Sequence, residues 1–156
     1  HVVCRNVEHA RKVISAPLIL ENITYTVAFP GAELTEAEFL RELTDALDCG
    51  LLLDVTNIRV NCENHSLPAQ EFLDALPLDR VTQLHFVGHS RRNGKLIDDH
   101  SSPTQPEIWS IMEEVARRAP VKGIILERDV DIPPFDELAA ELARAREIGR
   151  RFGRWD

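Results

Sequence analysis

Long apolar runs are absent from this sequence, and no stretch approaches the ~20 residues that a membrane-spanning helix needs. We therefore expect no membrane contact. Cysteine is scarce: the three cysteines form no Cys-x-x-Cys pair, which disfavours a disulfide scaffold and a thiolate metal site and favours a reducing, cytoplasmic compartment. Basic residues are also in deficit, with 18 Lys and Arg against 26 Asp and Glu and a net charge of −8. Nucleic-acid binding proteins present a basic face, so no nucleic-acid partner is expected.

Several familiar motifs are missing as well. No glycine-rich dinucleotide fingerprint or phosphate-binding loop follows an apolar run. The Gly88-His89-Ser90 segment does not match a nucleophile elbow, so a serine hydrolase has no support. The chain begins at His1 without an initiator Met or a signal-like segment, and we expect a fragment or a short form of a longer protein.

What the sequence does contain is a weak internal repeat in a chain long enough for one domain, residues 1–156. Apolar runs end in an acid at Glu21, Asp54 and Glu127, and a related run carries His85. These four polar residues are 31 to 42 residues apart, and a strand–helix–strand unit takes about 30 or more. Short runs that are apolar on both faces are typical of buried parallel strands, which we predict near residues 17–22, 50–55, 81–87 and 122–128.

Helix signals fill the intervals between the predicted strands. Thr35–Glu38 and Thr104–Glu107 have the form of capping boxes, and Pro68 suits the start of a short helix. Helices are also expected over Arg5–Ile14 and Phe135–Phe152. Alternation of strands and helices predicts an α/β fold with a parallel sheet. Four such units amount to half of a (β/α)8 TIM barrel, which takes about 250 residues.

Polar residues collect where these strands end, which is where α/β folds place their chemistry. A lone strand-end acid is usually a helix cap or an ion-pair partner, and a lone histidine is usually structural, but four consecutive units with such a residue favour a common site. We expect loops after Asp54 (residues 55–65) and after His85 (residues 88–100, with an Asn93-Gly94 turn). These loops add Asn57 and an Asp-x-His pair, Asp98 and His100, whose side chains would share one side of an extended chain. Carboxylates with imidazole suit iron, manganese or zinc. His65 and His89 are ambiguous between ligands and loop-ordering residues, and Cys4, Cys49 and Cys62 fit buried apolar positions.

Longer segments, in order and spacing, carry a family resemblance over nearly the whole chain. They are Leu20–Asn22, Glu36–Leu40, Gly50–Asn57, Asn64–His65, Gln83–Ser90, Leu96–His100 and Leu126–Pro133. In these segments the sequence resembles the multinuclear non-heme iron-dependent oxidative enzymes, of which the methanobactin biosynthesis oxidase is a member. The chain matches the carboxyl-terminal half of that family's xylose-isomerase-like barrel.

The resemblance implies two or three iron ions at the strand ends and a reaction in which dioxygen modifies a peptide residue, often cysteine or asparagine. It implies a peptide substrate, and a partner protein that presents the peptide. Carried over by position, it implies these metal ligands: Glu21, Asp54, Asn57, His85, Asp98, His100 and Glu127. This chain departs from the family pattern at Thr56, where a second asparagine is usual, and at Arg128, where tryptophan is common.

The family's first four strands have no counterpart here, nor have two further histidines that would complete its metal cluster. An open four-stranded sheet has two unpaired edges, so we expect closure by a second copy, by the missing half or by another protein. Two alternatives stay open at this point. One is a metal-dependent hydrolase or isomerase related to apurinic endonucleases or xylose isomerase, and the other is a non-catalytic half-barrel that pairs with a partner.

Overall fold

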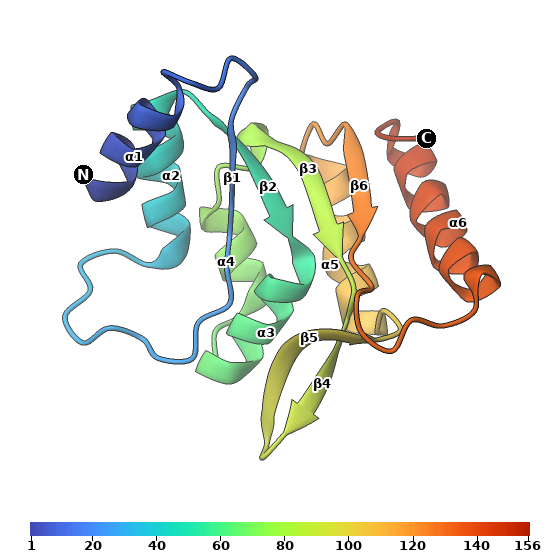
Figure 1. Ribbon diagram of the computed structural model, residues 1–156. Coiled ribbons are helices and arrows are strands. Elements are labelled where there is room, and N and C mark those ends of the chain that lie inside the picture. The colour runs from blue at the N-terminus through green and yellow to red at the C-terminus, as the bar shows by residue number, and fades with distance from the viewer.

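The computed structural model describes residues 1–156, and its centre is a four-stranded parallel sheet in the order β1-β2-β3-β6 (Figure 1). The strands are β1 (Ile19–Glu21), β2 (Gly50–Asp54), β3 (Val81–Phe86) and β6 (Gly123–Leu126). The predicted α/β class and all four predicted parallel strands are confirmed, although β1 and β6 are shorter than expected. No helix has the length and apolar character needed to cross a membrane.

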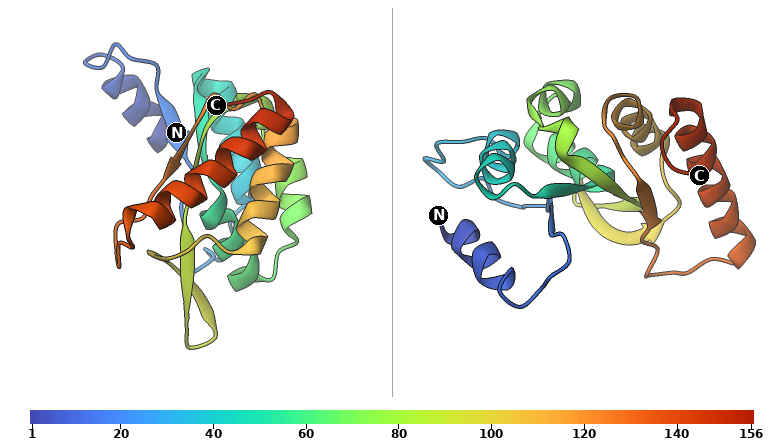
Figure 2. Two further views of the ribbon diagram at one scale, coloured as in Figure 1. Left: turned by 90° about the vertical axis from the view of Figure 1, so that its right-hand side faces the viewer. Right: turned by 90° about the horizontal axis from the view of Figure 1, so that it is seen from above.

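Helices cover one face of this sheet, as the views along its edges show (Figure 2). They are α2 (Glu36–Leu47), α3 (Val55–His65), α4 (Ala69–Ala75) and α5 (Pro106–Arg118). At the flanks, α1 (Val2–Ala10) packs on α2 and α6 (Phe135–Phe152) packs on α5. A single helical turn, η1 (Leu78–Arg80), leads into β3.

Alternation along the strands decides which side chains fill the core and which face the other way. On β2, Leu51 and Leu53 are fully buried toward the helices, and on β3 Leu84 and Phe86 are buried likewise. The intervening positions therefore point to the face without helices, and they include His85. Parallel registry pairs Asp54 with His85, so these two polar residues lie side by side on that face at the carboxyl ends of their strands.

Four sequence expectations about local structure are wrong. Thr104–Glu107 is no capping box: Pro106, with its fixed φ and no N–H, takes the first helical position, so Gln105 becomes the N-cap of α5. The first helix ends at Ala10 and not at Ile14, because its buried face is formed by Val3, Cys4 and Val7, whereas Val13 is 81% exposed.

The third concerns residues 55–65, which we expected to be a loop and which form α3. Asp54 caps this helix, and its buried residues include the polar Asn57 and Asn61. A helix buried on several sides with polar residues turned inward lacks the amphipathic pattern by which helices are predicted. Residues 88–100, also expected to be a loop around Asn93-Gly94, lie in the antiparallel hairpin of β4 (Gly88–Arg92) and β5 (Lys95–Ser102), with the turn at the expected place.

Candidate metal centre

Four of the predicted ligands converge at the carboxyl end of the sheet. Each of Glu21, Asp54, His85 and Glu127 offers a ligand atom, and these atoms all lie within 4.8 Å of one another. We call these residues the four-residue cluster. His85 Nδ1 lies 2.9 Å from Glu127 Oε1 and 3.5 Å from Glu21 Oε1. Three carboxylates this close repel one another in the absence of a cation.

Asp54 is built into the fold more firmly than the other three. It is 1% exposed, and its Oδ1 accepts hydrogen bonds from the backbone N–H groups of Thr56 and Asn57 as the N-cap of α3. The caps occupy one carboxylate oxygen, and the second oxygen is available to a ligand. Burial raises the pKa of Asp54 to about 7, and the carboxylates of Asp98 and Glu21 act in the same direction.

Asn22 is a positioning residue that our sequence reasoning did not single out. It is 2% exposed, its Nδ2 donates to the Asp54 carbonyl at 3.0 Å, and its Oδ1 accepts from the Asp54 N–H at 2.8 Å. Its own carbonyl accepts from Asn57 Nδ2 at 2.9 Å. The one available signal was an amide directly after a strand-end acid. Asn22 ties the ends of β1 and β2 together and so fixes Asp54 relative to Glu21.

Replacing Asn22 with alanine is expected to lower the free energy of unfolding by about 2–4 kcal/mol, because the buried N–H and carbonyl of Asp54 lose their partners. Urea unfolding followed by circular dichroism measures this loss. The matched control is Asn6→Ala on the exposed face of α1. Equal stability of the two variants would show that Asn22 does not hold the site.

The remaining predicted ligands border the cluster. Asn57 is buried beside Asp54, and its Oδ1 has no hydrogen-bond partner. Asp98 and His100 meet on β5 with Asp98 Oδ1 3.2 Å from His100 Nε2, although a positive φ at His100 makes the strand irregular there. Burial is the main cause that raises the pKa of Glu21. The Asp98 carboxylate adds to this rise, and His100 opposes it. Burial raises the pKa of Asp98 too.

The donor set fits a metal ion. Buried polar atoms are normally hydrogen-bonded, yet Asn57 Oδ1, His85 Nδ1 and Asp98 Oδ1 have no partner in hydrogen-bonding geometry. Carboxylate, amide and imidazole ligands without thiolate match iron, manganese or zinc. The cysteines contribute nothing here: Cys49 and Cys62 are buried elsewhere, and burial raises the pKa of the Cys62 thiol to about 11.

The two ambiguous histidines lie outside the four-residue cluster. His65 orders the segment after β1, because its Nε2 lies 2.9 Å from the Tyr25 carbonyl and its ring stacks on the Tyr25 ring at 4.6 Å. His89 is on β4, where its backbone N–H and carbonyl both bond to the side chain of Gln105. Thr56, which departs from the family pattern, clips α3 to the end of β3: its hydroxyl donates to the Val87 carbonyl and accepts from the Val87 N–H.

Residues 1–150 match the model of a family described as the RiPP precursor modification enzymes MbnB/TglH/ChrH. The chain belongs to this family. Relatives include a UPF0276 protein of Caulobacter vibrioides, 44% identical over 153 residues, and one of Rhizorhabdus wittichii, 45% identical over 148 residues. These matches cover 96% and 94% of this chain and 55% and 52% of the relatives, so the chain spans about half the length of the curated relatives it matches. A UPF0276 protein of Chromobacterium violaceum is 39% identical over 146 residues.

Proposed function

We propose that this chain supplies the carboxyl-terminal half of an iron-dependent enzyme that oxidatively modifies a cysteine or asparagine of a precursor peptide. The observation that carries the proposal is the convergence of Glu21, Asp54, His85 and Glu127 within 4.8 Å at the strand ends of a member of a peptide-modifying family. Manganese and zinc are the alternative occupants by donor chemistry.

The residues of the proposed centre fall into groups with different roles. Glu21, Asp54, His85 and Glu127 hold a first ion, and Asn57, Asp98 and His100 extend the donor set toward further ions. Ferrous iron, when bound, supplies the redox chemistry for which no side chain of this site suffices. Asn22 and the α3 N-terminus hold the Asp54 carboxylate in one orientation, so that little reorganisation is needed on binding.

The sheet is proposed to be half of a TIM barrel, since β1 and β6 each have only one neighbouring strand and the relatives are about twice as long. The face without helices includes Ile125, which is 44% exposed. Exposed strand edges favour pairing with another chain. Our preferred partner is a polypeptide equivalent to the missing half; a second copy and an unrelated protein are the alternatives.

Closure is tested by mixing this chain with the part of the Caulobacter vibrioides relative that it does not match. Sedimentation velocity at micromolar concentration is expected to show a one-to-one complex. A chain that stays monomeric alone and in the mixture would contradict the half-barrel proposal.

The activity is tested with the iron-loaded closed complex, oxygen and a precursor-like peptide that contains cysteine and asparagine. Mass spectrometry is expected to show an oxidative mass change that requires iron and oxygen and disappears in the Glu127→Ala variant. An unchanged peptide in the loaded complex, or a change that Glu127→Ala leaves intact, would contradict the proposed function.

A further inference from the structure

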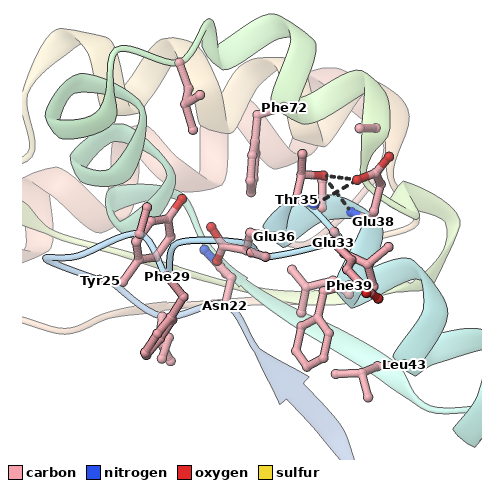
Figure 3. A pocket seen from close by; sticks show the side chains of 18 of the residues that line it. Asn22, Tyr25, Phe29, Glu33, Thr35, Glu36, Glu38, Phe39, Leu43 and Phe72 are labelled. Atoms are coloured by element: carbon pink, nitrogen blue, oxygen red, sulfur yellow. Dashed lines mark hydrogen bonds between the residues drawn. The ribbon is translucent and has the colours of Figure 1, made fainter.

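An open cavity of about 1040 Å³ lies beside the four-residue cluster, between the segment after β1 and helices α2 and α4 (Figure 3). Glu21 and Asn22 form part of its wall, so the cavity adjoins the candidate metal centre. Most of its lining is apolar, and some of that lining is unusually exposed: Phe29 is 83% and Phe39 42% exposed. Further exposed apolar residues of the wall are Ile23, Val27, Leu34 and Leu67. A contiguous exposed apolar surface of this kind is typical of a binding site.

The charged residues of the cavity wall all have one sign. Five of the 24 lining residues are glutamates, and the wall contains no lysine, arginine or histidine. The glutamates are Glu21, Glu33, Glu36, Glu38 and Glu71. Glu38 is already committed to the N-terminus of α2, where its carboxylate accepts from the N–H and hydroxyl of Thr35. The others leave a negative field over an apolar surface, which favours a ligand with a cation on an apolar stem.

Glu36 is the carboxylate placed for that cation. It lies in the middle of the cavity with the rings of Tyr25, Phe29, Phe39 and Phe72 around it (Figure 3). Its one side-chain partner is Asn61, whose Nδ2 lies 3.2 Å from Glu36 Oε2 and also donates to the Ile23 carbonyl. One neutral amide is a weak counterpart for a partly buried carboxylate, and burial accordingly raises the pKa of Glu36 to about 7.

The segment after β1, which forms the outer wall of the cavity, is held in place by side chains of α3. Asn61 Oδ1 accepts from the Tyr25 N–H at 3.1 Å, and His65 bonds the Tyr25 carbonyl and stacks on its ring. Both residues belong to α3, the helix that Asp54 caps. The cavity wall and the metal cluster are therefore fixed to the same helix.

We propose that this cavity binds a lysine or arginine of the peptide substrate, with the cation on Glu36 and the neighbouring apolar side chains of the peptide against Phe29 and Phe39. Aromatic ring faces attract the cation of lysine or arginine and also pack against the apolar stem of its side chain. The peptide would then lie across the rim beside Glu21, with its basic residue as an anchor. This inference rests on the proposed function for the identity of the ligand as a substrate, but peptide binding requires neither metal nor turnover.

The test uses two fluorescein-labelled peptides, Gly-Leu-Lys-Leu-Gly and the same peptide with norleucine in place of lysine, which keeps the stem and removes the charge. Fluorescence anisotropy with the metal-free 156-residue chain is expected to give at least about tenfold tighter binding of the lysine peptide, the effect of one charge-assisted hydrogen bond. Glu36→Gln is expected to reduce this preference to less than about twofold. The matched control Glu137→Gln, on α6 away from the cavity, keeps it.

Phe29→Ala provides a second variant that cannot disturb the core, since Phe29 is 83% exposed, and it is expected to weaken both peptides several-fold. Equal binding of the two peptides to the wild-type chain, or a lysine preference that survives Glu36→Gln, would overturn the proposal. Titration with Mn²⁺ tests the metal centre separately. Glu36→Gln is expected to leave Mn²⁺ affinity unchanged, so a loss of peptide preference in this variant is not a loss of the metal centre.

Discussion

Replacing His85 with alanine is expected to weaken binding of Mn²⁺ or Fe²⁺ at least about 100-fold. Residues that only support a ligand already contribute 10- to 100-fold to metal affinity, and in the proposed centre His85 supplies the nitrogen ligand between Glu21 and Glu127. Isothermal titration calorimetry with Mn²⁺, on protein freed of metal by chelator, measures the change.

His9→Ala is the matched control for the loss of an imidazole, because His9 lies on α1 away from the cluster. It is expected to bind the ion like the wild type. If His85→Ala retained wild-type affinity while remaining folded, the ion would be bound elsewhere and the four-residue cluster would be structural.

The Asp54→Asn variant is expected to be more stable than the wild type without metal and less stable than the wild type with metal. At pH 8 without metal, the variant should be about 1–3 kcal/mol more stable than the wild type. Asp54 has its pKa raised from 3.8 to about 7, so the wild type loses stability as the pH rises through that interval, and asparagine removes the charge that causes the loss. The asparagine oxygen keeps the capping bonds from Thr56 and Asn57.

With Mn²⁺ at a thousand times its dissociation constant, the wild type should gain about 4.1 kcal/mol, or about 8–16 °C in the unfolding midpoint. Asp54→Asn should gain far less, because it has lost an anionic ligand. Thermal unfolding of both proteins, with and without Mn²⁺ at pH 8, tests the reversal. Parallel gains in the two proteins would exclude Asp54 from the metal centre.

A pH effect of the same sign is expected from Glu36, independently of any metal. Its pKa is raised from 4.5 to about 7, so the folded chain binds this proton more tightly than the unfolded chain does, and stability falls between these pH values. Glu36→Gln should reduce that fall, as urea unfolding at pH 5 and pH 8 would show. Identical pH profiles for variant and wild type would contradict the environment described for Glu36.

The strands and the candidate ligands could be predicted because both depend on short-range patterns. An apolar run that ends in Glu21, Asp54 or Glu127 marks a parallel strand and its carboxyl end together. Convergence then follows from parallel topology, which brings all strand ends to one edge. The geometry places four predicted ligands in one cluster and three beside it, and their role as ligands remains a proposal.

Tertiary contacts account for what could not be predicted. In helix α3, Asn57 points inward and donates to the Asn22 carbonyl, and Asn61 points inward and accepts from the Tyr25 N–H. Because these inward positions are polar, the sequence of α3 lacks an apolar stripe. Asn22 acts through partners 32 residues away, which no local pattern reveals. The cavity around Glu36 likewise depends on how residues 22–35 fold back over α2 and α4.

Anomalous diffraction from crystals soaked in Fe²⁺ without oxygen shows whether the four-residue cluster binds iron. We expect an iron peak at about 2.0–2.2 Å from a ring nitrogen of His85 and from carboxylate oxygens of Glu21, Asp54 and Glu127. A chain that takes up no iron, or an iron peak away from all four of these side chains, would contradict this expectation.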